Sequence, residues 1–246
     1  MIPLLTHILI VAQICWSTPA SSFVVDDLGY VYTLHEYSVI KHALNGDTMF
    51  VYSRMDLGSV SELDVSNPLR PLVFHKETAS IAILDNTLSE QGVISVWNVL
   101  QGQPGSVASG VNQDIWIYDE INQELFRLDE RLNISVSSGF IPGITGRHIQ
   151  LIGIAERHEQ LWLADANYGI WIFDRFGTLV HRIPVQDLRS MRAHAEAVIL
   201  TTSHGVFEVN YSSRALDHLS DSSGEMDYVG DKWFSYEQNR ICIDTR

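Results

Sequence analysis

The sequence predicts an all-β fold, a six-bladed β-propeller of four-stranded antiparallel blades closed by an N-terminal strand. One pattern of apolar and aromatic residues, with the length of a strand, recurs six times along the 246 residues. A second strand pattern follows each copy within a few residues. No long segment shows the 3.6-residue hydrophobic period of a helix. A single-sheet barrel is the runner-up, but it does not explain repeat units of 34 to 46 residues.

The two recurring patterns can be read directly from the sequence. Copies of the first are GYVYTLHE (29–36), RPLVFHKE (70–77), DIWIYDE (114–120), QLWLADA (160–166), EAVILTTS (196–203) and DKWFSYE (231–237). Copies of the second are SVIKHALN, SIAILDN, ELFRLDE, GIWIFDR, GVFEVNY and RICIDTR. Alternating or clustered apolar residues over this length are typical of strands. Units of this size at a regular spacing indicate a repeat architecture.

An Asn or Asp residue stands at the end of every copy of the second pattern: Asn45, Asp85, Asp129, Asp174, Asn210 and Asp244. Such side chains hydrogen-bond their own backbone two residues later and so stabilise tight turns. Several are followed by further turn residues, as in Asn45–Gly46. We therefore interpret the six residues as structural turns and not as catalytic groups.

Two further strands complete each predicted blade. A third strand follows each turn, and a weaker strand precedes most units. The sixth unit ends at Arg246 before its outer strand, whereas residues 22–27 form a strand that belongs to no unit. Pairing the two would close the ring and remove two free sheet edges. We therefore predict a propeller domain over residues 21–246 with residues 22–27 as its clasp.

Residues 1–20 are predicted to be a signal peptide. Residues 1–22 contain no Asp, Glu, Lys or Arg. The apolar stretch from Ile8 to Ile14 is too short to span a bilayer but suits the core of a signal peptide. Thr18 and Ala20 provide small residues before a cut after Ala20, although no basic segment precedes the apolar stretch. The chain is therefore expected to be periplasmic or otherwise exported.

The sequence around the two cysteines predicts neither a lipid anchor nor a disulfide. The residues before Cys15 lack the small side chain that a lipidation signal requires, so a lipoprotein is disfavoured. A cut after Ala20 would leave Cys242 as the only cysteine. On that basis we expect no disulfide, and Cys242 is expected to be buried within its apolar run.

Charge and motifs exclude several functions. A net charge of −14 opposes binding to nucleic acid or to an anionic membrane. The sequence contains no nucleophile elbow, P-loop, dinucleotide fingerprint or zinc-protease motif, so no cofactor and no catalytic residue is predicted. Acidic turn residues such as Asp119 and Asp165 could bind a cation, but they lack the spacing of a calcium loop. Trp116, Trp162 and Trp233 share one repeat position, which favours packing between blades over sugar binding.

One loop between blades is a candidate contact surface for a protein partner. The segment from residue 139 to 148 is rich in Gly and Pro and shows no strand pattern. Apolar side chains on an exposed loop rimmed by polar residues are typical of protein interfaces. The alternative is that they fold over the edge of a blade. The candidate residues are Phe140, Ile141, Ile144, Arg147 and His148.

The segment from residue 63 to 92 resembles an uncharacterised family of exported propellers from Bacteroidota. The resemblance rests on its Ser-Asn-Pro turn, its LVF strand and its I-x-I-L-D-N strand, together with DDLGYVYT and GIWIFDRFGT elsewhere. It covers nearly all of the chain after the predicted signal peptide. The resemblance implies an envelope location, and more specifically the small periplasmic subunit that plugs the type nine secretion translocon at the outer membrane.

The favoured function is therefore a non-enzymatic scaffold or plug that binds another envelope protein. The expected partner is an envelope protein such as an outer-membrane translocon, with no nucleic acid and no transmembrane span. One alternative is a propeller that binds a small ligand or a glycan. The other is a hydrolase of the lactonase kind, which would need acidic and amide side chains that converge on the central channel.

Overall fold

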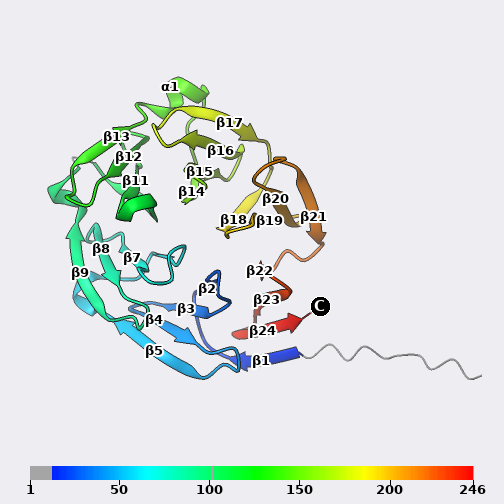
Figure 1. The fold of residues 1–246 in the computed structure, drawn as a ribbon. Helices are drawn as coiled ribbons and strands as arrows, with labels where there is room; N and C mark the ends of the chain where they lie inside the picture. Colours follow the sequence, from blue (N-terminus) through cyan, green and yellow to red (C-terminus); the bar gives the residue numbers. More distant parts are fainter. Residues whose placement is uncertain (1–12, 101, 246) are drawn as a thin grey trace, which may run out of the picture.

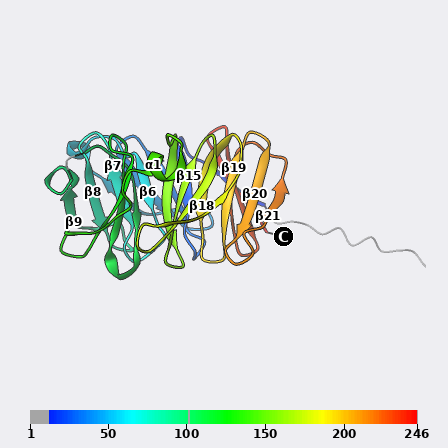
Figure 2. The ribbon, with the colours of Figure 1, turned by 90° about the horizontal axis from the view of Figure 1, so that it is seen from above.

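Six four-stranded antiparallel sheets form a closed ring in the computed structural model, which describes residues 13–100 and 102–245 (Figure 1). Each sheet is one blade, and in five of the six blades the strands follow chain order from the centre of the ring to the rim, whereas the rim strand of the sixth comes from the start of the described chain. Seen from the edge, the ring is a disc whose loops lie on two opposite faces (Figure 2). The predicted all-β, six-bladed propeller is therefore confirmed.

The first three blades contain twelve strands and are accompanied by three short helical turns. Blade 1 contains β2 (Ser22–Val25), β3 (Val31–His35), β4 (Ser38–His42) and β5 (Thr48–Ser53), followed by η1 (Met55–Leu57). Blade 2 contains β6 (Glu62–Asp64), β7 (Leu72–His75), β8 (Ser80–Leu84) and β9 (Glu90–Ser95), followed by η2 (Val96–Asn98). Blade 3 contains β10 (Pro104–Ser109), η3 (Val111–Gln113), β11 (Ile115–Asp119), β12 (Glu124–Leu128) and β13 (Ile134–Ser137).

The second half of the ring begins after a single helical turn, α1 (Ile141–Thr145). Blade 4 contains β14 (Leu151–Arg157), β15 (Gln160–Asp165), β16 (Gly169–Asp174) and β17 (Leu179–Ile183). Blade 5 contains β18 (Leu188–Ala193), β19 (Ala197–Thr202), β20 (Gly205–Asn210) and β21 (Leu216–Ser220). Blade 6 contains β22 (Glu225–Val229), β23 (Lys232–Glu237), β24 (Arg240–Thr245) and, at the rim, β1 (Gln13–Ser17).

The hydrophobic core lies between the blades. Each of five clusters of buried residues joins two neighbouring sheets. The cluster between blades 3 and 4 places Trp116 and Tyr118 against Leu161 and Phe173. Burying a large apolar side chain contributes about 1.5–3 kcal/mol, so a single blade is stable only with its neighbours. The three tryptophans at the shared repeat position, Trp116, Trp162 and Trp233, are all buried, which confirms their predicted role in packing.

The clasp is formed by other residues than those predicted. Residues 22–25 form β2, the innermost strand of blade 1, and pair with β3. The strand that completes blade 6 is β1, which pairs with β24. Trp16 of β1 also packs on His42 of blade 1, with ring centroids 5.8 Å apart. The prediction of a clasp at residues 22–27 is therefore wrong. The sequence did not reveal β1 as the clasp, because its strand pattern overlaps the apolar stretch that predicts a signal peptide.

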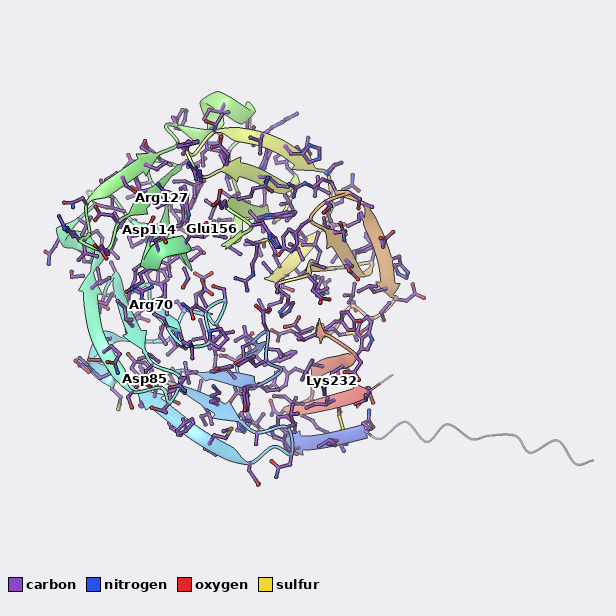
Figure 3. The ribbon with its side chains drawn as sticks, viewed as in Figure 1. Arg70, Asp85, Asp114, Arg127, Glu156 and Lys232 are labelled. Atoms are coloured by element: carbon purple, nitrogen blue, oxygen red, sulfur yellow. A yellow bond between two sulfur atoms is a disulfide. The ribbon has the colours of Figure 1, made fainter. Side chains whose placement is uncertain are left out.

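A disulfide between Cys15 and Cys242 joins the two ends of the described chain (Figure 3). The two residues lie directly opposite each other on β1 and β24, with Cα atoms 4.2 Å apart. The uncut chain therefore has a disulfide, and the expectation of none applies only to a chain cut after Ala20. A cut after Ala20 would remove β1 and Cys15, and whether that cut occurs stays a prediction. Most of the predicted signal peptide, residues 1–12, lies outside the described residues.

Candidate functional site

The predicted partner loop, residues 139–148, connects β13 of blade 3 with β14 of blade 4 and contains α1. Pro142 lies in the first turn of α1, where a missing backbone N–H costs little. Gly146 ends the helix in the left-handed conformation, with φ at 68°, and its N–H donates to the carbonyl of Pro142. This helical turn holds the loop in one conformation above the blade edge.

The loop divides into exposed and buried residues. Phe140 and Ile144 are exposed, with 56% and 47% of their surface accessible. Arg147 and His148 are also exposed, and the Arg147 guanidinium lies 4.9 Å from the centre of the Tyr168 ring. Ile141 is fully buried in the cluster between blades 3 and 4. The prediction that Ile141 is a contact residue is therefore wrong, because its side chain anchors α1 to the core.

Three other exposed apolar residues lie on the same face of the ring as Phe140 and Ile144. The loops between consecutive blades and the loops between second and third strands share this face, as the bonds from Arg54 N to Tyr37 O and from Glu120 N to Gln103 O show. We call the five residues the apolar arc. Their exposed fractions lie between 47% and 73%, and they are Met55, Trp97, Ile121, Phe140 and Ile144.

The apolar arc occupies only one side of this face. Its residues come from the junctions between blades 1 and 2, 2 and 3, and 3 and 4, and from a turn of blade 3. The remaining junction loops, residues 184–187, 221–224 and 18–21, expose no large apolar side chain among the described residues. Charged side chains border the arc, and several of them are paired, as are Asp56 with Arg54 and Glu120 with Lys76. The face therefore combines an apolar half, with a charged border of both signs, and a polar half.

The Asx residues lie far from this arc, in the turns between third and fourth strands on the opposite face. Five of them accept hydrogen bonds from backbone N–H groups two to four residues later: Asn45, Asp85, Asp129, Asp174 and Asn210. Asp85 is labelled in Figure 3, at the rim of the ring. Asp244 lies inside β24, opposite Trp233. The turn prediction is wrong for Asp244, because β24 continues in register to pair with β1.

The centre of the ring contains a cavity of about 620 Å³. It is lined by the innermost strands of blades 1 to 5 and by residues that flank them. Glu62 and Asp64 of β6 reach across to the neighbouring strand β10. Glu62 accepts hydrogen bonds from Ser106 Oγ at 2.8 Å and from the N–H of Val107 at 3.1 Å. Asp64 accepts one from the N–H of Ser109.

These carboxylates take the place of backbone pairing between inner strands. Because the blades radiate from the centre, the inner strands of neighbouring blades leave N–H groups that need other acceptors. Burial raises the pKa of the Glu62 carboxyl to about 7, and its hydrogen bonds with Ser106 and Val107 oppose the shift. The Glu62 side chain is only half-buried by its accessible surface, because one side of it faces the channel.

On the other side of the channel, charged pairs join blades that lie far apart in the sequence. Arg192 of β18 contacts Glu225 of β22 at 2.9 Å and donates to the carbonyl of Phe23 in β2 at 3.1 Å. His194 Nε2 lies 2.6 Å from Asp227, and its Nδ1 lies 3.4 Å from Asp27. Burial disfavours the charged imidazole, but these two carboxylates outweigh it and raise the pKa of His194 to about 9.

A third charged group lies between blades 3 and 4. Glu156 accepts a hydrogen bond from Trp116 Nε1, and the Arg127 guanidinium lies 5.6 Å from the Trp116 ring (Figure 3). Asp114 pairs with Arg127 at 3.4 Å. Burial raises the pKa of the Glu156 carboxyl, against the effect of its bond with Trp116. This group holds Trp116 in place, and its charged residues do not line the central cavity.

Sequence reasoning missed the channel residues. Glu62 and Arg192 lie in the inner strands, and His194 directly follows one, and these strands have the weakest pattern in each unit. The available signal was polar residues at alternate positions, as in Glu62 and Asp64, which would place both on one face of a strand. The acidic turn residues considered for a cation, Asp119 and Asp165, accept hydrogen bonds from the backbone of their own turns. Within residues 13–100 and 102–245, no group of three or more His, Cys, Asp or Glu side chains is arranged to hold a metal ion.

No helix within the described ranges is long and apolar enough to span a membrane. Comparison of the sequence with known proteins finds no matching family model and no matching curated protein. The structural comparisons therefore address the fold. The resemblance to exported propellers from Bacteroidota and to a type nine secretion subunit stays an expectation.

Several solved propellers resemble this chain. A catalytically inactive virginiamycin B lyase from Staphylococcus aureus, crystallised with quinupristin, has a TM-score of 0.63 and 13% identity, over 96% of this chain and 99% of that chain. The WD40 domain of Neurospora crassa Pan2 has a TM-score of 0.57 and 11% identity, over 91% and 74%. BBS1N in complex with ARL6DN has a TM-score of 0.58 and 10% identity, over 88% and 74%. At these identities the likeness shows that the chain has the β-propeller fold, and it shows no more than that.

Proposed function

We propose that this chain is a non-enzymatic, protein-binding scaffold of the cell envelope that contacts its partner through the apolar arc. The observation that carries the proposal is the gathering of Met55, Trp97, Ile121, Phe140 and Ile144 on one side of one face. Exposed apolar residues that gather on one side and are bordered by polar groups are typical of protein interfaces. A propeller of this fold binds a protein in the complex of BBS1N with ARL6DN, which is a precedent for such use.

The chemistry of the arc indicates the kind of partner. Large anchors such as Trp97 and Phe140 concentrate binding energy when a partner covers them. The net charge of −14 favours a partner whose surface carries an excess of Lys or Arg around its apolar centre. Such a charge pattern accelerates association and fixes orientation more than it adds affinity.

Two observations support an envelope location as part of this proposal. Disulfides persist in oxidising compartments such as the periplasm and are rare in the cytosol, and the Cys15–Cys242 bond closes this ring. A Cys15 sulfur that is bonded to Cys242 has no thiol left to carry a lipid, which supports a chain without a lipid anchor. The more specific role of a plug in an outer-membrane translocon rests on the sequence resemblance alone.

Photo-cross-linking in cells that express the chain tests the contact surface. A photoreactive residue would replace Trp97 or Ile121 in the arc, and in control proteins it would replace Leu28 or Leu69. The control residues are equally exposed apolar side chains, at 69% and 71%, in loops on the opposite face. We expect a discrete cross-linked protein from the arc positions and none from the controls. Equal labelling from both faces, or labelling only from Leu28 and Leu69, would contradict the proposal.

Truncation of the anchors gives the matching energetic test. The double variant Trp97→Ala and Phe140→Ala should weaken binding to the cross-linked partner by about 2 kcal/mol or more. The double variant Leu28→Ala and Leu69→Ala should bind as the wild type does. Titration of the purified partner, with circular dichroism to verify folding, measures both.

The channel favours a second candidate function, the binding of a small ligand, through a separate set of residues.

A further inference from the structure

A second cavity of about 370 Å³ opens where the inner strands of blades 4, 5 and 6 begin. We call it the mouth cavity. It shares Glu62, Arg192 and several other wall residues with the central cavity, so the two adjoin. Its volume lies within the range of about 300–1,000 Å³ that small-molecule sites occupy. It opens on the same face as the apolar arc but among blades that contribute no residue to the arc.

The charge balance of the channel wall differs from that of the whole chain. The chain has 16 Lys and Arg residues against 30 Asp and Glu residues. Around the two cavities, the acidic wall residues are Asp27, Glu62, Asp64 and Glu225. The basic wall residues are Lys76, Arg157, Arg189, Arg192 and His194. The wall is therefore close to neutral with a slight excess of positive groups, in a protein that elsewhere repels anions.

Arg189 is the basic group of the mouth cavity with the least occupied guanidinium. Arg192 is held by Glu225 and by the carbonyl of Phe23. Arg189 is exposed, and its hydrogen bond from Nη1 to the carbonyl of Ser223 is long, at 3.4 Å. A guanidinium in this state can donate two parallel hydrogen bonds to a carboxylate without breaking a contact that holds the blades together.

Hydroxyl groups line the same cavity. Ser22, Ser190, Thr201 and Ser223 all contribute to its wall. Thr201 is 3% exposed and its hydroxyl oxygen is fully buried, so the hydroxyl groups that this wall offers to a ligand are those of the serines. Ile152, Ile154 and Met191 provide an apolar floor.

We infer that the mouth cavity binds a small, hydroxyl-rich molecule that carries one carboxylate, a sugar acid in chemical class. Arg189 would hold the carboxylate, and the serines would hold the hydroxyl groups. The apolar floor would lie under the carbon skeleton. A single negative charge matches the wall, because Glu62 and Glu225 also face this cavity and would repel a phosphate of charge −2.

Calorimetric titration of the purified full chain tests this inference with three probes of one skeleton: glucuronate, glucose and glucose 6-phosphate. We expect saturable binding of glucuronate with a dissociation constant of about 1 mM or lower. Glucose should bind at least about tenfold more weakly, since it lacks the charged group that Arg189 pairs with. Absence of glucuronate binding, equal binding of glucose, or a preference for the phosphate would each overturn the assignment.

Two variants and one control assign the binding to this cavity. Arg189→Ala should weaken glucuronate binding about tenfold or more, and Ser190→Ala, which removes one hydroxyl group of the wall, should weaken it severalfold. Arg175→Ala is the matched control, because Arg175 is an exposed arginine in a turn outside the channel, where it contacts the exposed Glu159 and Phe176. Unchanged affinity in Arg189→Ala, or an equal loss in Arg175→Ala, would overturn the inference. A failed titration leaves the apolar arc untouched, since the two surfaces share no residue.

Discussion

Removal of the Cys15–Cys242 disulfide should lower the stability of the ring more than any exposed substitution in the same strand. The two cysteines are 227 positions apart in the sequence, so the bond encloses almost the whole described chain. A cross-link over a loop of this length reduces the entropy of the unfolded chain by an amount worth about 5 kcal/mol at 25 °C. Removal of native disulfides costs about 2–5 kcal/mol in practice, so we expect Cys15→Ser to fall in that range.

The measurement is reversible unfolding in denaturant, with thermal unfolding beside it. For a chain of this size the expected loss lowers the melting temperature by about 5–15 °C. Cys242→Ser should have the same effect as Cys15→Ser, and the double variant should cost no more than either single variant, because all three remove one bond. Ser17→Ala is the control, since Ser17 is an exposed residue of β1 that takes no part in the bond.

Two results would refute this reasoning. One is a melting temperature of Cys15→Ser equal to that of the oxidised wild type, which would mean that backbone pairing of β1 with β24 closes the ring alone. The other is a free thiol at Cys15 in protein that unfolds with the same cooperativity. Addition of a reductant to the wild type provides an independent check, because it should reproduce the stability of the serine variants.

Three further predictions concern titration and turns. The pKa of Glu62 rises from 4.5 to about 7 on folding because burial disfavours its charge. Its contribution to the free energy of unfolding therefore falls as the pH rises from 4.5 to 7. Glu62→Gln should remove this part of the pH dependence, as measured by urea unfolding. The pKa of His194 rises from 6.5 to about 9, so its contribution to the free energy of unfolding is complete below pH 6.5 and disappears as the pH rises through 9. A His194→Gln variant whose stability keeps the wild-type pH dependence in this range would contradict the ion pairing with Asp227 and Asp27. Asp174→Ala should lower the free energy of unfolding by about 1 kcal/mol, because the side chain loses its hydrogen bonds with the backbone of its turn. Asp244→Ala inside β24 should change it by about 0.5 kcal/mol or less. Equal losses would contradict the distinction between turn and strand.

The repeated part of the fold could be predicted from the sequence because the same physical requirement recurs in each blade. Several second and third strands, such as β11, β15, β16 and β19, are buried on both faces, so their apolar and aromatic pattern is strong. The turns between third and fourth strands need a side chain that accepts backbone N–H groups, which fixes Asx at five of the six positions. Burial and turn chemistry therefore both leave a signal in one sequence.

The ring closure and the channel could not be predicted in this way, since each depends on residues far apart in the chain. β1 has five residues, and its alternation merges with the apolar N-terminal stretch. Arg192 meets Phe23 across 169 positions, and no local pattern announces such a contact. The loop of Ile141 has no strand pattern, so the sequence leaves open whether this side chain is exposed or folded over the blade edge, and one turn of helix buries it.

Ring closure and removal of the N-terminus compete for the same residues. Gln13–Ser17 form the outer strand of blade 6, and Cys15 joins it covalently to β24. A cut after Ala20 would leave blade 6 with three strands and expose the edge of β24, where unpaired N–H and C=O groups invite pairing with another chain. It would also free Cys242. A mature protein that keeps the closed ring must therefore retain residues 13–17, and any processing compatible with that ring must lie before Gln13. The disulfide forms in the oxidising compartment that export would supply, so on the proposed location the ring is completed after the chain has crossed the membrane.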